Sequence, residues 1–107
     1  TAGEAVRKII GGQIKAEEYV SSCLSQIKHR EPNIKAWVCL DEQHAVNQAK
    51  IIDKKISAGE KTGTLAGIPV GIKDVFNSID FPTQMGSPIW KNFTPGNDAR
   101  AVFCLRQ

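Results

Sequence analysis

The sequence predicts an α/β fold that consists mainly of helices, with one or two short strands. Apolar residues recur at intervals of three and four over several long stretches, which is the spacing of a buried helical face. Two short apolar runs, residues 36–40 and 68–73, are instead rich in residues that favour strands. The 107 residues, 41% hydrophobic and 23% charged, have the composition of one globular domain or part of one.

The first two helices are predicted from the signals at their ends. Thr1 and Glu4 have the spacing of a capping box, and the helix that follows them ends at Gly11. The second helix covers about residues 15–30. Pro32 ends this helix, because a proline disfavours helical geometry in the residue before it.

Two further helices complete the predicted order. Asp41 caps a third helix, which ends near Gly59. A fourth helix begins at Asn97 or Asp98 and is still running at Gln107, where no Gly, Asn or Pro terminates it. We therefore expect that the chain is truncated at its C-terminal end.

Charge, hydropathy and cysteine content exclude several classes of protein. The formal net charge is +3 and basic residues are mixed with acidic ones, so direct binding of nucleic acid is not expected. No stretch has the length of a membrane span, and the N-terminus lacks the apolar core of a signal peptide. The three cysteines, Cys23, Cys39 and Cys104, lie far apart and have no metal-ligand spacing. We expect reduced, buried cysteines in a cytoplasmic protein that uses no metal or cofactor.

The apolar run at residues 68–73 ends in a charged residue, Lys73. Side chains of a strand alternate between two faces, so Lys73 shares its face with Pro69 and Gly71, which add little bulk. Either Lys73 simply reaches solvent, which composition alone favours, or it lies in a dry cleft as an uncharged base or nucleophile. Keeping a lysine uncharged near neutral pH costs about 4.6 kcal/mol, which burial can supply if no carboxylate lies close by.

Three motifs resemble the N-terminal part of the amidase signature family. The sequence LAGIPVGIKDVF matches a strand that ends in Lys-Asp, and residues 83–87 match a Thr-x-x-Gly-Ser turn. Residues 95–102 match Pro-x-x-Asp-Ala-x-x-Val at the start of a helix. The resemblance covers essentially the whole chain, with one departure at Lys15, where the family usually has a Ser or Thr helix cap.

This resemblance implies a fold and a chemistry. The chain would be the N-terminal part, residues 1–107, of a single amidase domain with a mixed β-sheet core flanked by helices. Family members hydrolyse amides with a Ser–cis-Ser–Lys triad, and by motif Lys73 is the triad lysine. It would take a proton from a bridging serine, which activates the nucleophilic serine. Both serines lie downstream in the family and have no counterpart in this sequence, so we expect the chain alone to be inactive.

The remaining polar candidates are assigned structural positions. Thr83 and Ser87 are interpreted as turn-forming residues near the site, and Asp74 as a residue that fixes the end of the strand or the adjacent loop. His29 and His44 lie in polar helical contexts and are expected at the surface.

Several functions stay open at this point. A general amidase is favoured over the glutaminase subunit of a tRNA-dependent amidotransferase, because PTQMGSPIW lacks the Cys of the latter's pattern. A non-catalytic helical interaction module and a Schiff-base lysine are weaker alternatives. The expected partners are a small-molecule amide substrate and the remainder of the amidase chain, with a homodimer as a further candidate.

Overall fold

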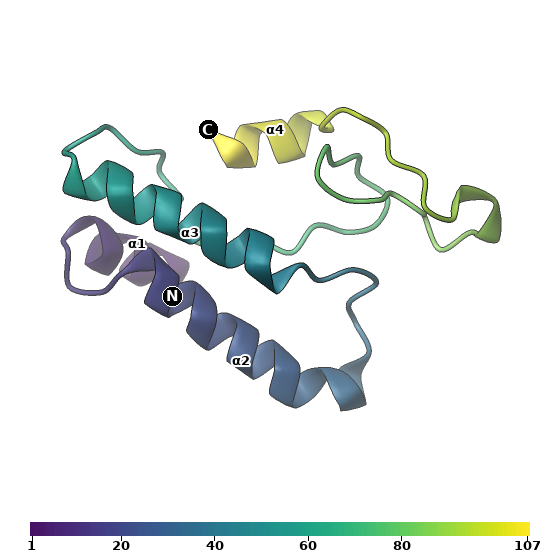
Figure 1. The fold of residues 1–107 in the computed structure, drawn as a ribbon, viewed down its shortest axis with the longest axis horizontal. Coiled ribbons are helices and arrows are strands. Elements are labelled where there is room, and N and C mark those ends of the chain that lie inside the picture. The colour runs from purple at the N-terminus through teal and green to yellow at the C-terminus, as the bar shows by residue number, and fades with distance from the viewer. The chain divides into compact units, whose positions relative to one another are not determined.

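The computed structural model describes all 107 residues, Thr1–Gln107, and every regular element in it is a helix. The elements are α1 (Ala2–Ile10), α2 (Ala16–Ile34), α3 (Glu42–Ser57), the short 3₁₀ helix η1 (Pro88–Trp90) and α4 (Arg100–Arg106). The chain divides into two compact units, Thr1–Pro69 and Val70–Gln107 (Figure 1). None of the helices combines the length and the apolar character that crossing a membrane requires.

The expectation of one or two short strands is wrong for this chain. Residues 36–40 and 68–73 are extended or irregular backbone and belong to no sheet. A strand exists only when a second extended segment pairs with its N–H and C=O groups, and neither run has such a neighbour. The helical part of the predicted fold class is present and its β part is absent.

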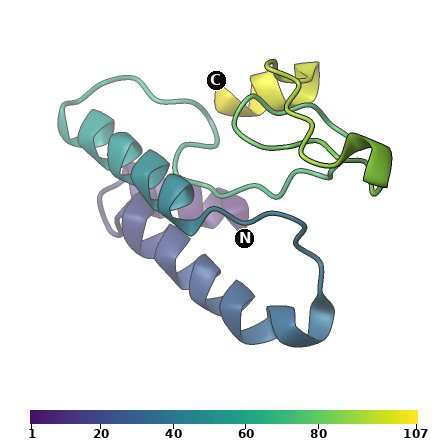
Figure 2. The same ribbon diagram turned by 45° about the vertical axis from the view of Figure 1, so that its right-hand side comes forward.

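The first unit is built on a pair of antiparallel helices. α2 and α3 lie side by side and run in opposite directions (Figures 1 and 2). Their facing sides and the end of α1 form a core of buried residues: Ile9, Ala16, Val20, Leu24 and Ala49. Val20 and Leu24 are four residues apart on α2, which agrees with the helical spacing of apolar residues in the sequence.

Helix ends agree with the sequence where the signal is local. Thr1 Oγ1 accepts a hydrogen bond from the Glu4 N–H at 3.3 Å, which confirms the capping box. The Asp41 carboxylate accepts one from the His44 N–H at 2.8 Å, which confirms the cap of α3.

The predicted stop at Pro32 is wrong, because α2 continues to Ile34. Pro32 lies in the last turn of α2, so its missing N–H and the crowding by its ring disturb only the end of the helix. The N–H of Lys35 still reaches the Glu31 carbonyl at 2.8 Å. Lys35 then ends the helix in the left-handed region, with φ 54°.

The start of α4 also differs from the prediction. The helix begins at Arg100, and Ala99 precedes it without a side-chain cap. Asp98 cannot act as the cap because its carboxylate is bound elsewhere, to the N–H of Ile79 at 2.8 Å and to Arg106.

The cysteines are unpaired, but they are not all buried. Cys23 is half-buried, whereas Cys39 and Cys104 are exposed. The expectation of three buried thiols is thus wrong for two of them, because apolar neighbours in the sequence do not by themselves place a residue in a core.

The first turn of α2 receives its cap from another helix. Asp53 of α3 accepts hydrogen bonds from the N–H groups of Ala16 at 2.7 Å and Glu17 at 3.0 Å. Glu18 accepts from the Lys15 N–H at 3.1 Å. These carboxylates satisfy the free donors of the helix start and complement the helix dipole. They replace the Ser or Thr that Lys15 displaces.

The loop after α3 returns to the helices, and its closest approach that requires a glycine is at Gly67. Gly67 has φ +78°, and a Cβ added to it would lie 2.8 Å from the Ala16 Cβ and 3.1 Å from the Ile9 Cδ1. Glycine is therefore required at position 67 both for its backbone conformation and for the space it leaves.

We predict that Asp53→Ala lowers the free energy of unfolding by about 1–2 kcal/mol, because two N–H groups of α2 lose their acceptor. Urea unfolding of the complete protein measures the change. Lys50→Ala is the control: it removes the neighbouring ion pair with Glu17, 3.4 Å long and partly exposed, and should cost less than about 1 kcal/mol. Equal losses in both variants would contradict the assignment of the cap.

We predict that Gly67→Ala is more destabilising than Gly59→Ala. Both glycines have positive φ, +78° and +70°, but a Cβ at Gly59 meets nothing within 4 Å. The Gly59 variant should therefore lose about 1–2 kcal/mol through backbone strain alone. The Gly67 variant should lose about 1–3 kcal/mol more, because Ala16 and Ile9 must move. Equal midpoints of thermal unfolding for the two variants would disprove the close contact.

Candidate active site

Lys73 lies at a sharp bend of the second unit. Its carbonyl oxygen accepts hydrogen bonds from the N–H groups of Val75 at 2.7 Å and Phe76 at 3.0 Å, so the chain reverses direction directly after the lysine. The side chain is exposed and forms no ion pair or hydrogen bond with any residue of the chain. The apolar residues before it, Val70 and Ile72, are also exposed. The dry cleft is thus not formed by residues 1–107, and the catalytic role of Lys73 stays a prediction.

Asp74 is bound to a turn that lies ten residues further along the chain. Its Oδ1 accepts a hydrogen bond from the Gln84 N–H at 2.7 Å, and its carbonyl oxygen accepts one from the Met85 N–H at 2.9 Å. The second carboxylate oxygen, Oδ2, is sealed from solvent and has no partner. This confirms that Asp74 fixes the adjacent loop, as expected from the sequence.

The turn itself, residues 83–87, has a mirror-image β-turn at its centre. The Ser87 N–H donates to the Gln84 carbonyl at 2.9 Å, and the two residues between them, Met85 and Gly86, have φ of 55° and 65°. Two consecutive positive φ angles define a type I′ turn. Met85 is held in a region that L-residues rarely adopt.

Thr83 anchors the start of this turn. It is almost completely buried, its hydroxyl donates to the Phe76 carbonyl at 3.3 Å, and its N–H donates to the Phe93 carbonyl at 2.8 Å. These contacts confirm that Thr83 is a turn-forming residue. Its hydroxyl is bound to backbone and has no base beside it, so it has no arrangement for nucleophilic attack.

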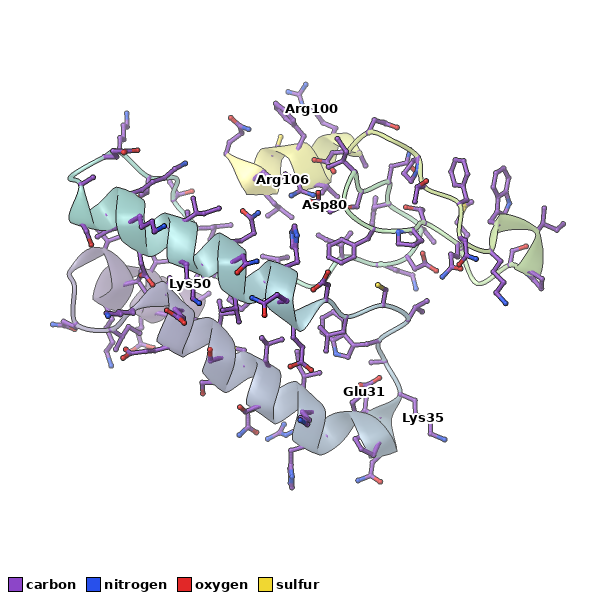
Figure 3. The ribbon with its side chains drawn as sticks, in the orientation of Figure 1. Glu31, Lys35, Lys50, Asp80, Arg100 and Arg106 are labelled. Atoms are coloured by element: carbon purple, nitrogen blue, oxygen red, sulfur yellow. The ribbon has the colours of Figure 1, made fainter.

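A second set of contacts ties the end of this unit together. Asp98 accepts the Ile79 N–H at 2.8 Å and pairs with Arg106 of α4 at 2.7 Å. Arg106 also pairs with Asp80 at 2.7 Å (Figure 3). The hydrogen bond from Ile79 lowers the pKa of Asp98, against the effect of burial, and Arg106 lowers it further. This cluster could not be predicted from the sequence, because nothing in the local pattern links residues that lie so far apart.

Neither histidine belongs to the candidate site. His29 is exposed on α2 and His44 is half-buried on α3, both in the first unit. Across the whole chain, no group of three or more His, Cys, Asp or Glu side chains is arranged to hold a metal ion. Chemically, the bend of the second unit presents the primary amine of Lys73.

Comparison with protein-family models matches residues 18–107 to the family described as Amidase. A glutamyl-tRNA(Gln) amidotransferase subunit from Trichodesmium erythraeum (strain IMS101) is 39% identical over 89 residues, which are 83% of this chain and 18% of that protein. The subunit of the same name from Rippkaea orientalis (strain PCC 8801 / RF-1) is 39% identical over 104 residues, 97% of this chain and 22% of that protein.

A solved structure is also similar. It is described as "An unexpected vestigial protein complex reveals the evolutionary origins of an s-triazine catabolic enzyme", and it matches with a TM-score of 0.88 and 29% identity. The match covers 96% of this chain and 23% of that one. The chain spans about a fifth of the length of the curated relatives that it matches.

We predict that the stability contributed by Asp98 depends on pH. A carboxyl group whose pKa is lowered by folding stabilises the folded state above its unfolded value, 3.8, and loses this contribution as the pH falls through the native value. Asp98→Asn should therefore be less stable than the native protein at pH 6, and the difference should shrink below about pH 4. Urea unfolding of the complete protein at both pH values measures it.

Asn97→Ala is the control for this experiment. Asn97 accepts a hydrogen bond from the Asn77 side chain at 3.3 Å and carries no titrating group. Its effect on stability should be the same at both pH values. A pH-independent difference for the Asp98 variant as well would contradict the assignment.

Proposed function

The chain belongs to the amidase family, and from this premise we propose that Lys73 is the general base of an enzyme that hydrolyses amide C–N bonds. One observation carries the proposal: an amine on a bend, braced by a Thr-x-x-Gly-Ser turn, with the neighbouring carboxylate already bound to that turn. A lysine can act as a base only if no carboxylate holds it in the charged form. The local geometry meets this condition.

The proposed reaction follows the serine–serine–lysine chemistry of the family. The uncharged amine of Lys73 takes a proton from a bridging serine, which takes one from the nucleophilic serine as the latter attacks the amide carbon. Backbone N–H groups stabilise the oxyanion, and the proton passes to the leaving nitrogen. Water then cleaves the acyl-enzyme. Both serines would come from the part of the protein that follows residue 107.

The desolvated environment that the amine of Lys73 needs must also come from the part of the protein that follows residue 107. Holding a lysine uncharged at neutral pH requires a desolvated site, at a cost of about 4.6 kcal/mol. Val70 and Ile72 are 47% and 37% exposed, which leaves apolar surface beside the amine for a neighbouring segment to cover. We propose that residues 68–73 join a mixed β-sheet in the complete protein, and that this sheet seals the amine from water.

A glutaminase subunit is the second candidate. The relatives from Trichodesmium and Rippkaea are both named as subunits of glutamyl-tRNA(Gln) amidotransferase, which favours it. In that case the substrate is the side-chain amide of glutamine, the product is ammonia, and the partners are other protein subunits. The absence of a Cys in PTQMGSPIW favours a general amidase instead. We also propose a cytoplasmic location, which the unpaired cysteines support.

We predict that Lys73→Ala and Lys73→Arg each lower kcat by about 10²- to 10⁴-fold in the complete protein, because a base is lost and arginine stays charged. Release of ammonia from simple primary amides and from glutamine, with and without partner subunits, measures the effect and separates the two candidates. Lys91, an exposed lysine of the same unit, provides the control Lys91→Ala, which should keep full activity. Native rates in both Lys73 variants would refute the proposal.

A further inference from the structure

Two consecutive N–H groups of the 83–87 turn bind the same residue. The Gln84 N–H donates to the carboxylate of Asp74 and the Met85 N–H donates to its carbonyl oxygen. One residue therefore holds the turn through both its side chain and its backbone. The turn cannot shift along the chain without breaking both bonds.

The carboxylate is also committed to this contact. Oδ1 accepts the Gln84 N–H at 2.7 Å, and Oδ2 is sealed from solvent and has no partner. The contact between the Gln84 N–H and Oδ1 is partly buried, and a hydrogen bond is electrostatically stronger there than in water. Asp74 is half-buried, one of its carboxylate oxygens is sealed from solvent, and its other polar contacts hold the turn, so it acts as a fixed point of the second unit.

Asp74 directly follows Lys73, the proposed base, in the sequence. The carbonyl of Lys73 is itself bound by Val75 and Phe76, so residues 73–76 form a tight bend, and the turn is attached to that bend at Asp74. A change in the backbone angles of Asp74 would turn the neighbouring peptide group and so change the direction of the Lys73 side chain. The position of the amine thus depends on the contact between Asp74 and the turn.

We propose that Asp74 is a positioning residue for Lys73. Its carboxylate holds the 83–87 turn against the lysine segment, and the turn in return keeps this carboxylate from pairing with the amine. This inference rests on the proposed role of Lys73. It assigns to Asp74 a geometric task, in which the hydrogen-bond acceptor matters and the negative charge does not.

Two conservative variants separate geometry from charge in the complete enzyme. Asp74→Asn keeps an oxygen that can accept the Gln84 N–H, but removes the charge. Asp74→Glu keeps the charge, but its extra methylene moves the oxygens away from a 2.7 Å contact. We expect Asp74→Asn to keep kcat within about threefold of the native value, and Asp74→Glu to lose about tenfold or more, since small misplacements of a reacting group are costly. KM should change less than about twofold in both.

Gln84→Ala is the matched control. It removes a bond of the same kind from the same turn, the 2.9 Å contact between the Gln84 side-chain oxygen and the Asn92 N–H, but keeps the backbone N–H that Asp74 binds. It should retain nearly native kcat. A fall as large as that of Asp74→Glu would show that any loosening of the turn has this effect and would overturn the inference.

The other outcomes are equally decisive. If Asp74→Glu retains native kcat, or Asp74→Asn loses as much as Asp74→Glu, the geometric role is wrong. Lys73→Ala, measured in parallel, keeps this test separate from the proposed function. Loss of activity in Lys73→Ala with native activity in Asp74→Glu rejects only the positioning role, whereas native activity in Lys73→Ala rejects the function itself.

Discussion

The close contact at Gly67 is the constraint on which the arrangement of residues 1–69 depends. At this position the chain passes within van der Waals distance of Ala16 and Ile9, which join the start of α2 to the end of α1. Both sides of the contact are small or tightly fitted, and Ala16 is completely buried. Because the contact tolerates no added atom, it fixes the point at which the chain leaves the helices toward Lys73. Gly67 near the start of the motif LAGIPVGIKDVF is thus required for packing, and it has no chemical role.

Aspartate side chains accept hydrogen bonds from backbone N–H groups that have no strand or helix partner in this chain. Irregular backbone has N–H groups that no ladder satisfies, and they need other partners. In four places the partner is an aspartate that reaches a backbone N–H of another residue: Asp41, Asp53, Asp74 and Asp98. These four aspartates therefore have structural roles, and at the candidate site Asp74 is bound to the turn whereas the side chain of Lys73 forms no ion pair.

Sequence reasoning succeeded where the physics is local. The caps at Thr1 and Asp41 depend on residues three positions away, and both are present. It failed where a partner is distant: the Asp53 cap joins residues 37 apart, and the hydrogen bond from Ile79 to Asp98 joins residues 19 apart. The strands failed for the same reason, since pairing is never a property of one segment. The position of Lys73 was predicted, but its surroundings depend on partners that no local pattern reveals.

The cap that Asp53 gives to α2 has a consequence for how the chain folds. The first turn of α2 gains its acceptor only after α3 has formed and docked, since the carboxylate arrives from 37 residues further along the chain. Most of the stability of a helix in a protein comes from the packing of its apolar face, so neither α2 nor α3 is counted as an independent folding unit. The two helices should instead appear together in one cooperative step, after a loop closure that delays nucleation, and α2 would stay frayed at its start on a nascent chain until the second helix has been synthesised.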